Sequence, residues 1–195
     1  MAGLRQRKKA ATRQGISDAA TRLFEARGFE AVTLAEIAAA ADVAQKTIWN
    51  YFGSKEELFF DAEPAVLAAL VAAVGDGPPT ATLRPLLDRP VVAGPCEWKD
   101  LHGPLYDGIR TFLACEQASP TLRARRTALT WEWAAPLGAA AGSPTWGAFA
   151  AATILLRHEA MRTAMLESLA PATVRGRVRS VLDEALGALP LTGER

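Results

Sequence analysis

Residues 33–52 read TLAEIAAAADVAQKTIWNYF, and this stretch predicts two short helices joined by a tight turn. Thr33 can act as an N-cap, and Glu36 three residues later completes a capping box. Apolar residues at helical spacing then give the first of these helices one buried face. Asp42 and Val43 interrupt the alanine run and fit a turn. The pattern is typical of a helix-turn-helix.

The second helix of the pair is expected over Ala44 to Phe52, with Ile48 and Phe52 pointing inward at i and i+4. Its other face is polar and aromatic, with hydrogen-bonding tips and one cation. The residues on that face are Gln45, Lys46, Thr47, Trp49, Asn50 and Tyr51. An α-helix fits the major groove of DNA, where such side chains reach base edges and phosphates. The sequence therefore predicts a helix that contacts DNA.

Two more helices flank this pair. A supporting helix is predicted from about Arg5 to Arg27, closed by Gly28 as a C′ residue. A fourth helix opens at Ser54, with Glu57 as its partner in a second capping box. In chain order, the first three helices are thus a supporting, a positioning and a recognition helix.

The net charge of the chain says little about its binding partners, but the distribution of charge along the sequence is informative. The chain has 195 residues and a formal net charge of +1, so no strong overall field favours nucleic acid. The N-terminal segment is basic, with no acidic residue before Asp18. Its cations are Arg5, Arg7, Lys8, Lys9 and Arg13. Such a segment is either a solvated terminus or, beside a helix-turn-helix, a contact to DNA phosphates or the minor groove.

Other features restrict the class of protein. Half of the residues are hydrophobic, enough for a sizeable core. Cys96 and Cys115 form no disulfide framework, which suits a reducing cytoplasm. The charged N-terminus does not resemble a secretory signal. The longest apolar runs, 65–74 and 148–156, are shorter than the ~18 residues of a membrane span. We expect a cytoplasmic protein.

The chain after Leu58 is also predicted to be helical, because no segment alternates apolar and polar residues as a strand does. Pro64 falls inside the apolar run 59–74. A proline inside a helix removes one hydrogen bond and destabilises the helix by ~3 kcal/mol, so a kink or a new helix start is predicted near Glu63. Breaks are predicted at 75–80 and 91–95. Further helices are predicted over 82–89, 101–118, 119–137, 144–169 and 171–189. The total is about nine helices.

The segment 28–58 resembles the DNA-binding domain of the TetR family of bacterial regulators, and the resemblance extends over roughly residues 10–60. The matching positions are Gly28-Phe29, Thr33, Ile37-Ala38, Asp42-Val43, Thr47-Ile48-Trp49, Tyr51-Phe52 and Ser54 to Leu58. Three positions depart from the family pattern. Asp42 replaces the turn glycine, and Trp49 replaces a common tyrosine. Ala44 replaces the Ser/Thr cap of the recognition helix, so Asp42 would have to supply that cap.

The resemblance implies DNA contacts for eight residues: Thr33, Gln45, Lys46, Thr47, Trp49, Asn50, Tyr51 and Lys55. Thr33, Lys55 and the Tyr51 hydroxyl would contact phosphates, whereas Asn50 can pair with adenine in a bidentate manner. The alternative for each residue is a solvent-exposed side chain without a partner. Trp49 could instead pack against the supporting helix.

For the C-terminal part, the resemblance implies that the last two helices pair with their copies in a four-helix homodimer interface. The apolar residues expected there are Phe149, Thr153, Leu156, Val174, Val178, Val181 and Leu182. Burial of both faces within one subunit is the alternative. A two-fold dimer would place two recognition helices on one face of a pseudo-palindromic DNA site.

For the middle helices, the resemblance implies a chamber that binds a small apolar or aromatic effector. Its candidate lining residues are Trp98, His102, Tyr106, Trp131 and Trp133, with Glu132 and His158 as weaker candidates. Trp131 and Trp133 lie ~200° apart on a helix and cannot both face one chamber. Ordinary core packing is the alternative for these aromatics. The spacing of the histidines and acids matches no standard zinc site, so we expect neither metal nor cofactor.

The sequence as a whole predicts an all-α protein with two domains. Residues 1–54 form a helix-turn-helix DNA-binding domain, and residues 55–195 form a helical effector-binding and dimerisation bundle. The expected function is a ligand-responsive repressor released from its operator by a small molecule. An activator or architectural DNA-binding protein without an effector is the alternative. An enzyme is not expected, because the sequence contains no GxSxG, P-loop, HExxH or dinucleotide motif.

Overall fold

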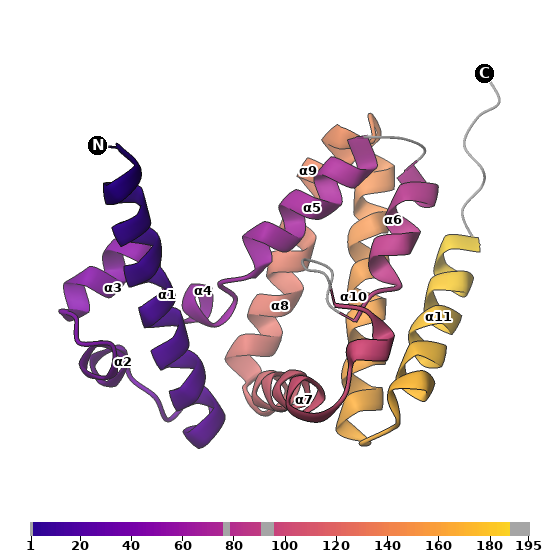
Figure 1. Cartoon of the computed structure of the whole chain (residues 1–195). Coiled ribbons are helices and arrows are strands. Elements are labelled where there is room, and N and C mark those ends of the chain that lie inside the picture. Colours follow the sequence, from indigo (N-terminus) through magenta and orange to yellow (C-terminus); the bar gives the residue numbers. More distant parts are fainter. Residues whose placement is uncertain (1, 76–78, 91–95, 188–195) are drawn as a thin grey trace. The chain divides into compact units, whose positions relative to one another are not determined.

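The computed structural model describes residues 2–75, 79–90 and 96–187, and in these ranges the protein is all helical, as predicted (Figure 1). The helices are α1 (Ala2–Arg27), α2 (Leu34–Ala40), α3 (Gln45–Tyr51), α4 (Lys55–Phe59), α5 (Glu63–Gly75), α6 (Pro79–Leu87), the 3-10 helix η1 (Trp98–Asp100), α7 (Gly103–Ala118), α8 (Pro120–Glu132), α9 (Ala134–Ala140), α10 (Pro144–Leu166) and α11 (Pro171–Gly187).

The described ranges contain two more α-helices than the nine expected from the sequence, because two predicted helices are divided. The first division lies before Glu63, where a fresh start was predicted. Pro64 therefore occupies the first turn of α5, where no intrahelical hydrogen bond is lost. The second division separates α8 from α9 at Trp133. The predicted loop at 91–95, the centre of the break at 75–80 and the last residues of the final helix lie outside the described residues.

Residue contacts divide the chain into two compact units. The first unit comprises residues 1–61 together with 115–123, and the second comprises residues 62–114 and 124–195. The end of α7 and the start of α8 thus belong to the first unit. The functional domain boundary predicted after residue 54 stays a prediction.

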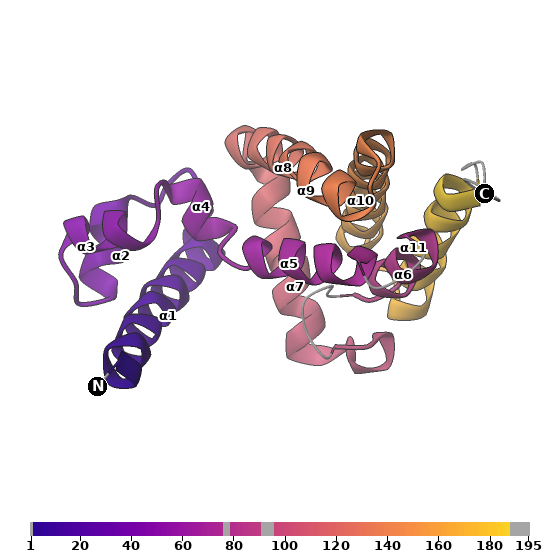
Figure 2. The same ribbon diagram turned by 90° about the horizontal axis from the view of Figure 1, so that it is seen from above.

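The core of the first unit forms where α1 meets α2 to α4 (Figure 2). Its apolar side chains are Ile16, Ala19, Ala20, Phe24, Phe29, Val32, Ile37, Ala38, Ile48, Phe52, Leu58 and Phe60, each at most 4% exposed. Phe24, Phe29 and Phe59 contact one another with ring centroids 5.3–5.8 Å apart. Gly28 closes α1 with φ of +78°, as predicted for a C′ residue.

In the second unit, α10 contacts both α9 and α11, while α5 contacts α6 and α9. Serine caps open two of the long helices. Ser143 accepts a hydrogen bond from the Trp146 N–H at 3.3 Å, and Ser119, in the first unit, accepts one from the Leu122 N–H at 3.1 Å. No described helix combines the length and the apolar character needed to cross a membrane.

Candidate nucleic-acid interface

The turn between α2 and α3 has the local geometry that the sequence predicted. Thr33 caps α2, and its capping box with Glu36 is complete, with the Thr33 N–H donating to the Glu36 carboxylate at 2.8 Å. That backbone hydrogen bond, then those from the Thr33 side chain and Arg27, lower the pKa of Glu36 to about 2. Asp42 adopts φ of +52°, the left-handed conformation expected where related sequences carry glycine.

One expectation for this turn is wrong. Asp42 does not supply the missing cap of the recognition helix, because Ala44 occupies the N-cap position and no side-chain hydrogen bond caps α3. The first turn of α3 therefore presents its N–H groups without a side-chain acceptor. The second predicted capping box is also altered. Ser54 caps α4 as expected, but the Glu57 carboxylate accepts the N–H of Gly53, at 2.8 Å.

Helix α3 has one buried and one exposed face. Ile48 is fully buried, whereas Trp49 next to it is 51% exposed. Gln45, Lys46 and Asn50 are exposed, and Thr47 and Tyr51 are half-buried. The predicted contact residues of α3 are therefore exposed or half-buried, and none of them belongs to the buried core of the first unit. Trp49 does not pack into the core beside α1, which was the alternative for this residue.

Thr33 and Lys55 lie at the flanks of this helix, and each already has protein partners. The exposed Thr33 hydroxyl donates to the Glu36 carboxylate at 2.7 Å. The Lys55 ammonium donates to the carbonyls of Phe29 and Val32, both at 2.9 Å, and lies 4.1 Å from the centre of the Phe29 ring. Lys55 therefore fixes the loop between α1 and α2, and only one of its three N–H donors remains for a phosphate. Its DNA contact stays a prediction.

Arg13 has a role that the sequence did not indicate. Its guanidinium donates to the Tyr51 carbonyl at 2.9 Å, forms an ion pair with Asp61 and lies 4.3 Å from the centre of the Phe52 ring. Arg13 thus connects α1 with the C-terminal end of α3. No local pattern could have predicted this contact, since 48 residues separate Arg13 from Asp61.

The predicted effector residues are dispersed over the second unit. Trp98 and Trp133 belong to its hydrophobic core, 8% and 4% exposed, whereas Trp131 is 48% exposed and points away from that core. His102 is exposed, and the half-buried Tyr106 donates its hydroxyl to the Leu169 carbonyl at 2.8 Å. Trp131 and Trp133 face different sides, as their spacing required. The chamber stays a prediction.

The predicted dimer residues also divide into two groups. Thr153, Val174, Val178 and Leu182 are at most 1% exposed within the subunit. The last three form the apolar stripe of α11, which packs against α10, α6 and η1, and Thr153 lies on α10. These four side chains are buried within the subunit, which is the alternative that the sequence left open, and their part in a dimer interface stays a prediction. Phe149 and Val181 are half-buried, and Leu156 is 53% exposed. These three remain available for an interface.

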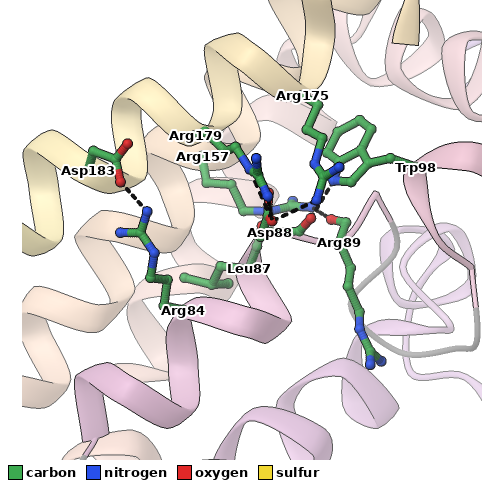
Figure 3. Close-up of polar contacts among 9 residues, drawn as sticks. All are labelled: Arg84, Leu87, Asp88, Arg89, Trp98, Arg157, Arg175, Arg179 and Asp183. Atoms are coloured by element: carbon green, nitrogen blue, oxygen red, sulfur yellow. Dashed lines mark hydrogen bonds and ion pairs between the residues drawn. The ribbon is translucent and has the colours of Figure 1, made fainter. Parts of the chain in front are cut away.

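A polar cluster at the end of α6 holds α11 in place, and its residues are drawn in Figure 3. The Asp88 carboxylate accepts hydrogen bonds from Arg175 at 3.1 Å and from Arg179 at 2.7 Å. Burial raises the pKa of Asp88, but the two arginines outweigh burial and hold this pKa below its ordinary value. The buried Arg157 donates to the carbonyls of Leu87, at 2.7 Å, and of the two residues after Asp88. Burial lowers the pKa of Arg157 to about 10.

This polar cluster has no feature of a metal centre. No group of three or more His, Cys, Asp or Glu side chains that could hold a metal ion occurs in residues 2–75, 79–90 and 96–187. Arg157 instead satisfies carbonyl groups where α6 ends, and Arg175 and Arg179 pair with the Asp88 carboxylate. The cluster is therefore a structural connection between α6, α10 and α11.

These observations define an all-helical protein whose N-terminal helix-turn-helix presents a polar and aromatic surface. Residues 16–62 match the family described as "Bacterial regulatory proteins, tetR family". The N-terminal part of the chain thus resembles the DNA-binding domain of the TetR family, as its sequence predicted. These matches agree with the prediction of a transcriptional regulator.

Two relatives are similar in sequence to parts of the chain. The "HTH-type transcriptional regulator TcmR" of Streptomyces glaucescens is 34% identical over 106 residues, which are 54% of this chain and 44% of that protein. The "Putative mycofactocin biosynthesis transcriptional regulator MftR" of Mycobacterium tuberculosis (strain ATCC 25618 / H37Rv) is 40% identical over 52 residues, which are 27% of this chain and 26% of that protein. The chain thus spans less than half the length of either relative.

Among solved structures, one similar chain is a "putative TetR-family transcriptional regulator" from Mesorhizobium loti MAFF303099. The similarity covers 91% of this chain and 96% of that one, with 16% sequence identity and a TM-score of 0.47.

Proposed function

We propose that the protein is a transcriptional repressor that acts in the cytoplasm. As a homodimer it binds a pseudo-palindromic operator, and a small apolar or aromatic molecule releases it. The match of residues 16–62 to the TetR family supports regulation of transcription in general. The name of the relative TcmR also describes a transcriptional regulator.

The observation that carries the proposal is the division of α3 into two faces. Ile48 is fully buried and fixes the helix to its unit, while Trp49 and Asn50 project outward. A short helix held in this manner can enter a major groove without loss of its own core contacts. About half of the Trp49 side chain is open to solvent, so its indole is accessible to a ligand. A contact with DNA would explain why such a side chain is kept at the surface.

The outer face of α10 and α11 supports the homodimer. A surface hollow of about 460 Å³ lies there, lined by Leu156, Glu159, Ala160, Thr163, Arg177, Ser180 and Val181. The exposed Leu156 is the apolar centre of this face. The ion pair between Arg177 and Glu167, 2.7 Å long, borders it. A face with an apolar centre and a charged border resembles the usual composition of an interface between subunits.

The proposed release mechanism acts through the connection between α4 and α5. An effector must bind the released state more tightly by ~1–3 kcal/mol or more to shift the equilibrium. Pro64 lies in the first turn of α5, just after the last residue of the first unit. Under this mechanism, Pro64→Ala changes the effector concentration needed for release. An unchanged titration would remove Pro64 from the mechanism.

DNA binding is tested with a duplex that the wild-type protein selects from random sequences. The surface tryptophans provide a matched pair, because Trp49 and Trp131 are 51% and 48% exposed in different units. Trp49→Ala should weaken binding to the selected duplex by about tenfold or more, and Asn50→Ala should also relax base preference at one position. Trp131→Ala should leave binding unchanged. Failure of the wild-type protein to select any duplex would refute the proposal.

Homodimer formation and effector binding need separate measurements. Light scattering at micromolar concentration should give twice the chain mass of 20.8 kDa, and Leu156→Glu should lower this value. A promoter assay distinguishes the repressor from an activator, the alternative function. Titration of tryptophan fluorescence with apolar and aromatic compounds tests whether an effector binds.

A further inference from the structure

A groove of about 290 Å³ lies on the first unit between the N-terminal half of α1 and the C-terminal end of α3. Its lining residues are Gln6, Lys9, Ala10, Arg13, Asn50 and Tyr51. Two of them, Asn50 and Tyr51, also belong to the recognition face of α3. The groove is therefore continuous with the surface proposed to contact bases.

One side of the groove is a single face of α1. Gln6, Lys9, Ala10 and Arg13 follow the spacing i, i+3, i+4 and i+7, which places them along one helical stripe. Gln6 and Lys9 are exposed, so their polar ends are free to reach a ligand. Lys8 is also exposed, but it lies about 150° around the helix from the centre of this stripe. The two adjacent lysines thus project to different sides of the same helix.

Arg13 holds the two walls of the groove together. It donates to the Tyr51 carbonyl at 2.9 Å and lies 4.3 Å from the centre of the Phe52 ring, both at the end of α3. Its ion pair with Asp61 fixes the guanidinium in this orientation. Because these contacts connect α1 with α3, the width of the groove is set by the fold. Arg13 is accordingly a positioning residue for the groove.

The electrostatic character of the groove favours an anion. The first 17 residues contain five cations and no acidic side chain. No acidic residue lines the groove, and Lys9 lines it as an exposed cation, while the charge of Arg13 is offset by its ion pair with Asp61. Lysine acts as a mobile point charge toward phosphate, and amide and hydroxyl groups also hydrogen-bond phosphate oxygens. Gln6, Asn50 and Tyr51 provide such groups next to the ammonium.

We propose that this groove binds the sugar-phosphate backbone of duplex DNA, and that Lys9 and Gln6 of α1 contact it there. The inference rests on the proposed function, because α3 must lie in the adjacent major groove. The phosphates held by α1 then belong to the backbone that borders this major groove. These contacts carry no base information and fix the register of α3 on the duplex. Sequence preference therefore stays with α3.

The test compares Lys9→Ala with Lys8→Ala on a duplex selected by the wild-type protein, over a range of salt concentrations. Both variants remove one exposed charge from the same helix, so general electrostatics change equally. Lys9→Ala should weaken binding about three- to tenfold and reduce the slope of log K against log salt by about 0.9. Lys8→Ala should reduce both quantities much less. Base preference should be unchanged in both variants.

Gln6→Ala provides a second measurement on the same groove. A neutral amide contact contributes affinity but releases no counterion, so Gln6→Ala should weaken binding and leave the salt slope unchanged. Circular dichroism of each variant checks that α1 is still folded. Because Gln6 and Lys9 are exposed, the spectra should match that of the wild-type protein.

Two outcomes would overturn the inference. If Lys8→Ala and Lys9→Ala have the same affinity and salt slope, the basic segment acts only as a diffuse charge. If DNA binding is normal in Lys9→Ala but an acidic protein partner is lost, the groove serves that partner instead. Both outcomes leave the proposed function intact. Failure of the wild-type protein to bind any selected duplex would reject the proposed function and the inference together.

Discussion

Replacement of Gly147 by alanine should strongly destabilise the second unit. Gly147 lies in the second turn of α10, where this helix passes α9 at very short range. A β-carbon built at this position would be 2.5 Å from the Gly138 nitrogen and 2.6 Å from the Gly138 α-carbon, and it would also contact the Ala134 carbonyl oxygen. All three atoms belong to the backbone of α9, so no side chain can rotate away.

The expected magnitude follows from these distances. Carbon atoms without a bond between them rest about 3.5 Å apart, so α9 and α10 would have to separate by roughly 0.9 Å. Extra methylene groups in a packed core cost about 1–3 kcal/mol, and rigid backbone neighbours place this substitution at the upper end. Alanine restores up to about 1 kcal/mol through its better helix propensity. We expect a net loss of about 2 kcal/mol or more.

Gly176 is a matched control for this substitution. It lies inside α11 in the same unit, it is exposed, and a β-carbon there meets no atom within 4 Å. Gly176→Ala should therefore stabilise the protein by about 0.5–1 kcal/mol, a change of opposite sign.

Urea unfolding followed by tryptophan fluorescence measures both variants, since the buried Trp133 and Trp146 flank the contact between α9 and α10. The close approach of the two helices predicts a lower urea midpoint for Gly147→Ala and a higher midpoint for Gly176→Ala. If Gly147→Ala were as stable as the wild-type protein, the close packing of α9 against α10 would be wrong.

Three further predictions concern single side chains. Ile48→Ala should lower the free energy of unfolding by about 2–5 kcal/mol in thermal or urea melts, because this side chain is fully buried. Lys55→Met should destabilise by about 1–3 kcal/mol in the same assay, because the Phe29 and Val32 carbonyls lose a charged donor. Asp88→Asn should make stability less dependent on pH in acid. Arg175 and Arg179 hold the pKa of Asp88 below its ordinary value in the folded protein, so the unfolded chain binds more protons in acid and stability falls as the pH decreases. Urea midpoints between pH 3 and 7 measure this effect, and equal pH profiles would contradict it.

Much of the fold could be predicted from local patterns. The helix starts at Thr33, Ser54, Ser119 and Ser143 were recognisable because a capping side chain and the first helical turn are adjacent in sequence. The fresh start before Pro64 followed from the missing N–H of proline. The inward direction of Ile48 followed from helical periodicity.

The sequence did not predict which apolar faces remain at the surface. Val174, Val178 and Leu182 show the periodicity of a buried stripe, and that periodicity is identical for burial inside a subunit and burial between subunits. The fold distinguishes these two kinds of burial, because the stripe of α11 packs against α10, α6 and η1 of the same subunit. Leu156 on the neighbouring helix remains exposed instead.

Local sequence therefore specified most of the helices, the threonine and serine caps and the exposed face of α3, because these features depend on residues within one or two turns of one another. Contacts between distant segments could be known only once the chain was folded. Arg13 reaches Asp61 across 48 positions, and Arg157 reaches the end of α6 across about 70. Charged side chains of this kind have many possible partners in sequence, and packing of the helices brings one of them within hydrogen-bonding distance.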